Sequence, residues 1–258
     1  MEEQLLKIFE GNSELFITTS STGEVDERGK VQVETFTVHE PVTLKLWKDH
    51  LDGKQRIGIK PEKDDLCKWG CIDIDPQSYK DYSQKKVIDI LRDNQLPLIP
   101  VRSKSGGLHL FLFLNDWSPV KDVLKKLHEW NKNFFQALEV FPMNKCMNMP
   151  YFNMNATTEF AYNENNTPIM IGGFLDLVKN KTVTIEQLSN IKVKEYEPEE
   201  DWKHYPPCIQ KMIMDKWSGN HRNDLLYNVG VLEMKKRDGK INIEEMTNIL
   251  AQRNQQIF

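Results

Sequence analysis

The sequence is short of the features that mark several classes of protein. Four cysteines in 258 residues are too few and too scattered to staple the chain with disulfides. No stretch approaches the roughly 20 apolar residues that a membrane helix needs. The N-terminal segment MEEQLLKIFEG is acidic and lacks the basic and apolar regions of a signal peptide. We therefore expect a cytoplasmic protein with free thiols and no membrane partner.

An excess of positive charge is also lacking. The formal net charge is −4, which argues against a protein that coats nucleic acid through bulk charge but leaves room for a local basic cleft. The hydrophobic fraction of 39% and the charged fraction of 28% are ordinary for a globular protein. A zinc site built on Cys67 and Cys71 would need two more ligands from distant parts of the chain, so free thiols are the favoured interpretation.

What the sequence does contain is an alternation of strand and helix patterns between residues 69 and 141. Short apolar runs predict strands at residues 69–75, 96–102, 108–114 and 136–141. Ser83 can cap the first connecting helix, and Pro119 opens the second. The order β-α-β-β-α-β is the ferredoxin-like, or RRM-like, arrangement. Right-handed crossovers place the first and third strands at its centre and the fourth beside the first.

The flanking segments complete an α+β chain. Alternating residues in LFITTS and VQVETFTV predict a β-rich N-terminal extension with a hairpin, and a short helix follows that ends at Gly53. Two prolines in the strand at 96–102 favour an edge position for it. After an acidic linker, 192–202, the pattern predicts a small helical module. We predict two domains, residues 1–190 and 203–258, the first with an RRM-like core at about 69–141.

Three carboxylates and a histidine fall on one predicted sheet face. Asp73 and Asp75 lie two apart on the first strand and therefore point to the same face. His109 lies on the neighbouring third strand, and Glu139 lies on the fourth. Each signal has a plain alternative, since an Asp-x-Asp at a strand end is often a solvated turn and a one-residue shift would turn Glu139 away. Together they predict one site, with helices on the opposite face.

The chemistry of such a site is that of a hard divalent cation. Converging carboxylates repel one another, and Mg²⁺ or Mn²⁺ removes that cost while keeping positions for water and phosphate. Two such ions about 4 Å apart can activate an attacking hydroxyl and stabilise a leaving pyrophosphate. We therefore predict that Asp73, Asp75 and Glu139 are the catalytic and metal-binding residues, with two ions bound.

The loop in VRSKSGGLH has the composition of a triphosphate site. It supplies positive charge, hydroxyl groups and two glycines, Gly106 and Gly107, that let the backbone approach phosphate oxygens. An alternative is that the glycines form a plain hairpin turn. The predicted nucleotide-binding residues are Arg102, Ser103, Lys104, Ser105 and His109.

Three segments, CIDID, SKSGGLHLFLF and LEVFP…MNMPYFN, resemble the three motifs of the archaeo-eukaryotic primase superfamily. The likeness is to the primase-polymerases of phages and mobile elements and covers roughly residues 40 to 180. It implies that Asp73, Asp75 and Glu139 bind metal and that Ser105 and His109 contact the nucleotide. Residues 208–239 resemble a primase C-terminal helical module through Gly219, Arg222 and Asn223, for which a plain helical bundle is the alternative.

The resemblance implies a DNA primase or primase-polymerase: a template-directed nucleotidyltransferase that makes or extends primers on single-stranded DNA from NTP or dNTP. A replicative helicase, separate or fused in a longer chain, would be its partner. Candidate stacking residues for the template are Trp117, Tyr151 and Phe152. The main alternative is a non-catalytic RRM-type module that binds single-stranded nucleic acid, since Phe111 and Phe113 share the face of His109. A metal-dependent nuclease is a weaker one.

Overall fold

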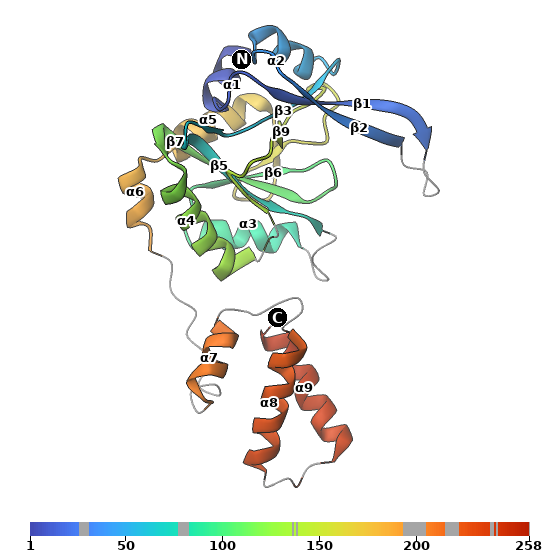
Figure 1. The fold of residues 1–258 in the computed structure, drawn as a ribbon, viewed down its shortest axis with the longest axis vertical. Helices are drawn as coiled ribbons and strands as arrows, with labels where there is room; N and C mark the ends of the chain where they lie inside the picture. Colours follow the sequence, from blue (N-terminus) through green and yellow to red (C-terminus); the bar gives the residue numbers. More distant parts are fainter. Residues whose placement is uncertain are drawn as a thin grey trace. The chain divides into compact units, whose positions relative to one another are not determined.

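A computed structural model describes residues 1–25, 31–76, 83–135, 137, 139–192, 205–214, 222–237, 240 and 242–257. The chain divides into two compact units, unit 1 from Met1 to Val193 and unit 2 from Lys194 to Phe258, and each is described by itself (Figure 1). Among the described residues, no helix combines the length and apolarity needed to cross a membrane.

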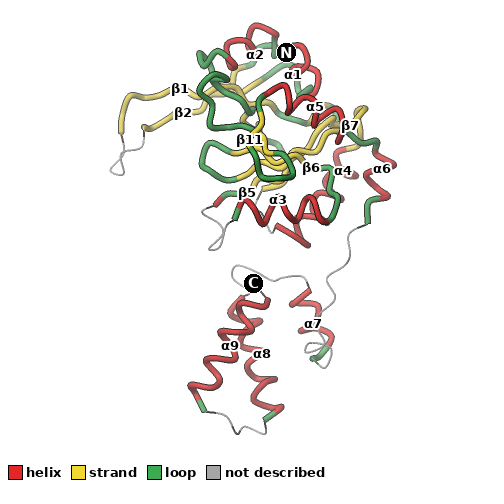
Figure 2. The backbone as a smooth tube through the Cα atoms, turned by 180° about the vertical axis from the view of Figure 1, so that it is seen from behind, coloured by secondary structure: helices red, strands yellow, loops and turns green. Residues whose placement is uncertain are grey.

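The smaller sheet of unit 1 has four strands in the order β2-β1-β3-β9. Their bounds are β1 Phe16–Val25, β2 Val31–Val38, β3 Arg56–Ile59 and β9 Met147–Asn148. The antiparallel pair β1 and β2 is the predicted hairpin, and it extends away from the rest of unit 1 (Figure 2). Residues 26–30 of its predicted polar turn lie outside the described residues. Helix α2 (Leu44–Leu51) follows, capped by the Thr43 hydroxyl, and Gly53 just after it has a positive φ of 77°.

The larger sheet has seven strands, in the order β11-β10-β6-β7-β5-β4 with β8 also paired to β5. The bounds are β4 Glu62–Lys63, β5 Leu66–Ile74, β6 Leu98–Arg102, β7 Leu108–Pro119, β8 Glu139–Phe141, β10 Ala161–Tyr162 and β11 Pro168–Ile169. Four of these strands lie side by side as β6-β7-β5-β8, which is the strand order predicted for residues 69–141. The α+β fold class is thereby confirmed.

The two crossover helices cover one face of this sheet. Helix α3 (Gln84–Asp93) begins after Ser83, whose hydroxyl accepts from the Lys86 N–H, and α4 (Val120–Trp130) begins after Pro119, both as predicted. A π-helical turn, Asn131–Phe135, extends α4. The apolar stripes of both helices pack against alternate residues of β5 and β7, such as Ile72 and Leu110. One half of the sheet's side chains is thus buried.

The opposite face is covered as well, over most of its length. Helices α1 (Glu2–Ile8), α2 and α5 (Ile171–Lys181) lie on that side of the sheet (Figure 1). Their apolar residues join the small sheet in a second core that buries Trp69, Phe111 and Phe113. Phe9 is the central ring, with centroids 5.5 Å from Trp69 and 5.3 Å from Phe111. Beyond these rings the face becomes partly exposed, at Asp73.

The predicted edge position of residues 96–102 is wrong. Strand β6 pairs with β7 on one side, and β10 adds to its other side through Ala161, opposite Val101. The Arg102 N–H also donates to the carbonyl of Phe160. The proline argument failed because β10 pairs with β6 at Val101 and the backbone donor is the Arg102 N–H, so the missing N–H of the neighbouring Pro100 is not needed, and Pro97 precedes the strand.

Unit 1 ends with α6 (Ile185–Asn190), which begins at a capping box formed by Thr184 and Gln187. Unit 2 contains helices α7 (Pro207–Met214), α8 (Arg222–Lys236) and α9 (Ile243–Ile257), as expected for a helical module. Its core is formed by Tyr205, Ile209, Ile213, Leu225 and Val229. Residues 193–202 of the predicted linker, and Gly219 from the resemblance, lie outside the described residues.

Candidate active site

The site begins with three side chains that lie next to one another across three strands. Asp73 on β5 pairs with His109 on β7 and, on its other side, with Glu139 on β8. Directly paired residues on antiparallel strands project from the same face. The Nε2 atom of His109 lies 3.5 Å from Oδ1 of Asp73. We call His109, Asp73 and Glu139 the cross-strand row; sequence reasoning predicted these three residues together, and the structure brings them together.

The row lies where the aromatic core ends. Trp69 and Cys71 precede Asp73 on the same face of β5, and both are fully buried. The side chain of Asp73 is 27% exposed, so the face opens at this position. Asp75 follows the last residue of β5 and is exposed. The carboxylates therefore stand at the boundary between the core and the solvent.

Burial and like charge dominate the electrostatics of the row. Burial, together with the nearby charges of Glu139 and Asp75, raises the pKa of Asp73 from 3.8 to about 6. Burial also lowers the pKa of His109 to about 4, so its ring is neutral at pH 7. A neutral imidazole does not compensate the carboxylate charge. His109 therefore adds no positive charge to the row at pH 7.

Glu139 is turned toward a cation that sequence reasoning missed. The Nζ atom of Lys145 lies 2.7 Å from Oε1 of Glu139. Within the described part of the chain, no three histidine, cysteine, aspartate or glutamate side chains are placed to hold one metal ion. The oxygen donors of Asp73, Asp75 and Glu139 fit a hard divalent cation in their chemistry. Glu139 would have to turn from Lys145 to join the two aspartates around such an ion.

The loop at 103–107 is a tight hairpin turn between β6 and β7. The Ser103 N–H donates to the Gly107 carbonyl, and the Gly106 N–H donates to the Ser103 carbonyl. Gly106 has a positive φ of 90°, and a Cβ on Gly107 would lie 2.0 Å from the carbonyl oxygen of Ile74. Both glycines are thus explained by the turn and its packing on β5. The hydroxyls of Ser103 and Ser105 lie 3.0 Å apart.

The predicted phosphate-binding cations differ in their placement. Arg102 pairs with Leu108, one position from the pair formed by Val101 and His109, so its side chain leaves from the opposite face of the sheet. Its guanidinium donates to the carbonyl of Thr158 at 3.1 Å. Lys104 is exposed at the turn. Lys104 therefore lies on the exposed turn, whereas the guanidinium of Arg102 is hydrogen-bonded to the backbone at Thr158.

The aromatic residues expected to stack bases are mostly unavailable. Tyr151 is 1% exposed, and its hydroxyl donates to the carbonyl of Ile169. Trp117 lies on β7 eight residues beyond His109, roughly 25 Å away along an extended strand. Phe152 is half-buried, with the guanidinium carbon of Arg56 4.2 Å from its ring centroid. Tyr151 is thus buried and Trp117 is distant from the site. Phe152, which is partly exposed and follows β9, is the remaining candidate of these three for stacking on a base.

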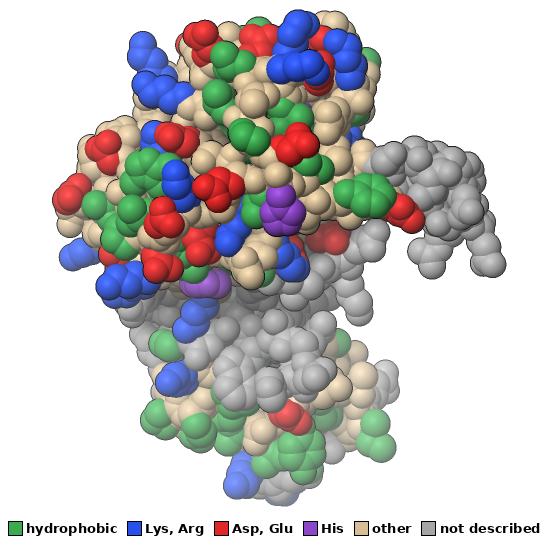
Figure 3. Space-filling view, turned by 45° about the horizontal axis from the view of Figure 1, so that its top comes forward, with side chains coloured by type: hydrophobic (Ala, Val, Ile, Leu, Met, Phe, Trp, Pro, Cys, Tyr) green, Lys and Arg blue, Asp and Glu red, His purple; other side chains and the backbone are tan. Residues whose placement is uncertain are grey.

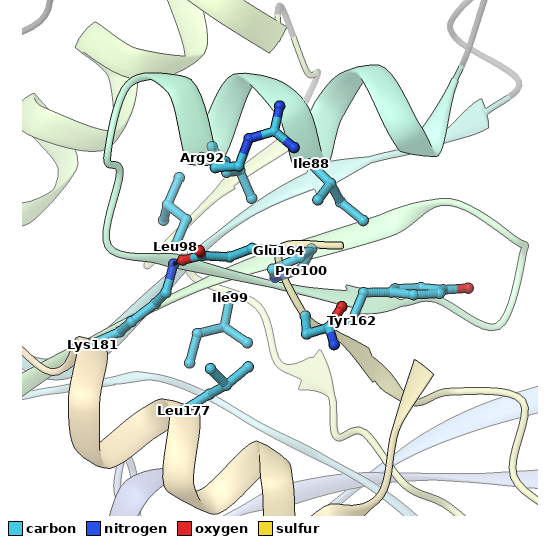
Figure 4. Close-up of a pocket in the computed structure, with 11 residues that line it drawn as sticks. Ile88, Arg92, Leu98, Ile99, Pro100, Tyr162, Glu164, Leu177 and Lys181 are labelled. Atoms are coloured by element: carbon cyan, nitrogen blue, oxygen red, sulfur yellow. Dashed lines mark ion pairs between the residues drawn. The ribbon is translucent and has the colours of Figure 1, made fainter. Parts of the chain in front are cut away.

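Two other features can be set aside as functional sites. Burial raises the pKa of the free thiols of Cys67 and Cys71, so both are inert, apolar side chains of the core. A small cavity of about 10 Å³ is lined by residues of α3, β6, β10 and α5, with the Lys181 and Glu164 ion pair of 3.2 Å at its rim (Figure 4). It has room for about one water molecule. On the face of the described residues in Figure 3, acidic and basic side chains are interspersed.

Comparison with known proteins adds a family to this geometry. Residues 15–140 match a family model described as "TOTE conflict system, Archaeo-Eukaryotic Primase domain". A search of curated proteins found no match. Among solved structures, one titled "Crystal structure of primase RepB'" aligns with 97% of this chain and 85% of that chain, at 11% identity and a TM-score of 0.33.

Proposed function

Residues 15–140 belong to the archaeo-eukaryotic primase superfamily, and from this premise we propose that the protein is a template-directed nucleotidyltransferase. It would make or extend primers on single-stranded DNA, as a DNA primase or primase-polymerase. The observation that carries the proposal is the cross-strand row, which lies inside the matched residues and beside the hairpin turn at 103–107. We further propose a replicative helicase as its partner and the cytoplasm as its location.

Asp73, Asp75 and Glu139 would hold Mg²⁺ or Mn²⁺. When bound, such ions make the attacking hydroxyl more acidic and offset the charge of the leaving pyrophosphate. The raised pKa of Asp73 supports this assignment, because it reports a position where negative charges accumulate at the edge of a low-dielectric core. Ionisation of such a carboxyl group is unfavourable without a counter-charge and becomes favourable beside a divalent cation.

His109 and the hairpin turn would hold the incoming triphosphate. With its pKa near 4, His109 is a neutral ring whose N–H can donate to Asp73 or to a phosphate oxygen without carrying charge. The hydroxyls of Ser103 and Ser105 and the ammonium of Lys104 lie on the turn just beyond it. Arg102 donates instead to the carbonyl of Thr158. The nucleotide would thus meet hydrogen-bond donors on one side and metal-binding carboxylates on the other.

The non-catalytic binding module lacks its main support. An RRM-type module displays aromatic rings on its central strands so that bases can stack on them. Here Phe111 is 0% exposed and Phe113 is 3% exposed, and both pack against Phe9. The sheet face therefore offers carboxylates rather than rings to a ligand.

The test is incorporation of labelled nucleotide on an unprimed single-stranded DNA template with Mg²⁺ or Mn²⁺. We expect product from the wild type and none from a variant that carries both Asp73→Ala and Asp75→Ala, with both proteins folded by circular dichroism. NTP and dNTP are supplied in separate reactions. Retention of synthesis by the double variant, or its absence from the wild type under every metal and nucleotide, would overturn the proposal.

A further inference from the structure

We propose that Lys145 is a positioning residue: it is the internal counter-ion of Glu139 and competes with a divalent cation for that carboxylate. The inference rests on the proposed function, because it concerns the third carboxylate of the same site. It explains why three carboxylates that share one region of the sheet are not gathered around a common point. It also assigns a task to a residue in a loop where the sequence offered no motif.

The position of Lys145 is fixed by the smaller sheet. The next strand, β9, begins two residues later and pairs Met147 with Ile59 on β3. The neighbouring residue Asn144 accepts a hydrogen bond of 2.9 Å from the Nζ atom of Lys60, which follows β3 directly. The backbone around Lys145 is therefore tied to a second sheet. Its side chain, by contrast, is 59% exposed and is free to move from one anion to another.

The ion pair is strong enough to orient Glu139 and weak enough to be exchanged. The two charged atoms are 2.7 Å apart, and the carboxylate is 39% exposed. Exposed pairs of this kind contribute about 0.2–1 kcal/mol, because water screens them. A divalent cation that already interacts with Asp73 would offer Glu139 twice the charge in a drier place. The Glu139 side chain would then turn from Lys145 toward Asp73, with which it is directly paired across the strands.

Asp73 would attract the cation first, and Glu139 would follow. Among the residues that the structure describes, Asp73 has no ion pair with a lysine or arginine, and its carboxylate lies 3.5 Å from the neutral ring of His109. Glu139 carries its own cation until it is recruited. Lys145 would therefore raise the concentration of divalent cation at which the site is half-occupied. The loss of affinity equals the free energy of the Lys145–Glu139 ion pair, which must be broken when the cation binds.

The test measures Mn²⁺ binding by electron paramagnetic resonance, without nucleotide or template. We expect Lys145→Met to bind Mn²⁺ about two- to fivefold more tightly than the wild type, which is the fold-change that the free energy of an exposed pair predicts. Lys145→Arg keeps the charge and should bind as the wild type does. The control for bulk charge is Lys45→Met, which removes a lysine that is 85% exposed and paired with Asp49 at 2.6 Å on α2, and it should not change binding.

Asp73→Asn serves to identify the ions bound at the site. Equal Mn²⁺ affinity in the wild type and Lys145→Met, at a site that Asp73→Asn abolishes, would overturn the role of Lys145 and leave the proposed function intact. A gain in Lys45→Met as large as in Lys145→Met would also overturn it, since bulk charge would then be the cause. If neither the wild type nor Lys145→Met has a Mn²⁺ site that depends on Asp73, both the role of Lys145 and the proposed metal site would be overturned. The Mn²⁺ concentration for half-maximal incorporation should fall in parallel with the dissociation constant.

Discussion

Two carboxylates in this protein lie at opposite extremes of charge compensation. Glu233 on α8 of unit 2 is 1% exposed and lies against the Tyr205 hydroxyl, Lys236 and Arg237. Burial raises its pKa, but hydrogen bonds from Tyr205 and Arg237 and the charge of Lys236 outweigh burial and lower it to about 2. Asp73 in unit 1 is more exposed, yet its pKa rises to about 6. The difference comes from neighbours and not from burial alone.

The comparison separates a structural carboxylate from a candidate ligand-binding one. Unit 2 surrounds Glu233 with donors, so its charge is satisfied within the protein. Unit 1 gives Asp73 two further carboxylates and a neutral histidine, which leaves its charge for something else to satisfy. Glu139 is intermediate between Glu233 and Asp73, because it has one compensating cation, Lys145.

The largest effect is expected from Asp73→Asn. The amide keeps the shape of the side chain and removes one metal-binding oxygen charge, so nucleotide incorporation should fall by about 100-fold or more. Unit 1 should stay folded, because the change also removes repulsion from Glu139 and Asp75. Single-turnover incorporation at saturating Mn²⁺ measures the first effect, and thermal unfolding measures the second. A variant that is inactive only because it is unfolded would contradict the assignment.

Glu233→Gln should have the opposite pattern: unit 2 should become less stable, and the cross-strand row in unit 1 should be unaffected. Removing one partner of a buried ionic cluster leaves Arg237 and Lys236 uncompensated, and we expect a loss of about 3 kcal/mol in the stability of unit 2. Hydrogen exchange by mass spectrometry should show faster exchange in α8 and unchanged exchange in β5. Equal protection of α8 in both proteins would show that the cluster stabilises little.

Gly107→Ala tests whether backbone packing holds Asp73 in place. The new Cβ would lie 2.0 Å from the Ile74 carbonyl oxygen, between the two aspartates, so the end of β5 must shift at a cost of about 2 kcal/mol. Gly172→Ala is the matched control, because a Cβ there meets nothing within 4 Å and the residue lies in α5. The control should keep or slightly raise the melting temperature. Similar melting temperatures for the two variants would contradict the close contact.

The last expected effect, similar in size to that of Gly107→Ala, concerns pH and the stability of unit 1. Asp73 has a pKa of about 6 when folded and an ordinary value of 3.8, so its protonation favours the folded state. Its contribution is fully present below pH 3.8 and is lost as the pH rises through about 6. Without added metal, the unfolding free energy of the wild type relative to Asp73→Asn should therefore fall by about 2 kcal/mol between pH 4 and pH 7. Urea unfolding at several pH values measures this difference, and a difference that rises with pH would contradict the assignment.

Much of the core of unit 1 followed from local patterns. Short apolar runs predicted β5 and β7, cap residues predicted the starts of the crossover helices, and the handedness of crossovers predicted that β8 lies beside β5. Those steps sufficed to bring Asp73, His109 and Glu139 into one row. The sequence offers two interpretations of Gly106 and Gly107, a close approach to phosphate or a plain hairpin turn, and the contact of Gly107 with Ile74 shows that strand packing requires one of them.

What could not be predicted depends on contacts between distant segments. Phe111 and Phe113 alternate with the same period as any displayed aromatic pair, and both are buried by the second core, in which Phe9 contacts the two rings. Lys145 reaches Glu139 through a bend between β8 and β9 that carries no periodic pattern. Strand β10 is two residues long, too short to be distinguished from a loop by its sequence.

The ring of Phe9 has a practical consequence for anyone who wishes to isolate the smallest active piece. All residues of the cross-strand row lie within 73–139, and the family match spans 15–140, yet Phe9 precedes the match and Phe174 follows it. A fragment cut at those limits would leave Trp69, Phe111 and Phe113 without their cover. Such a fragment would carry every residue of the row and still come out of solution as an aggregate.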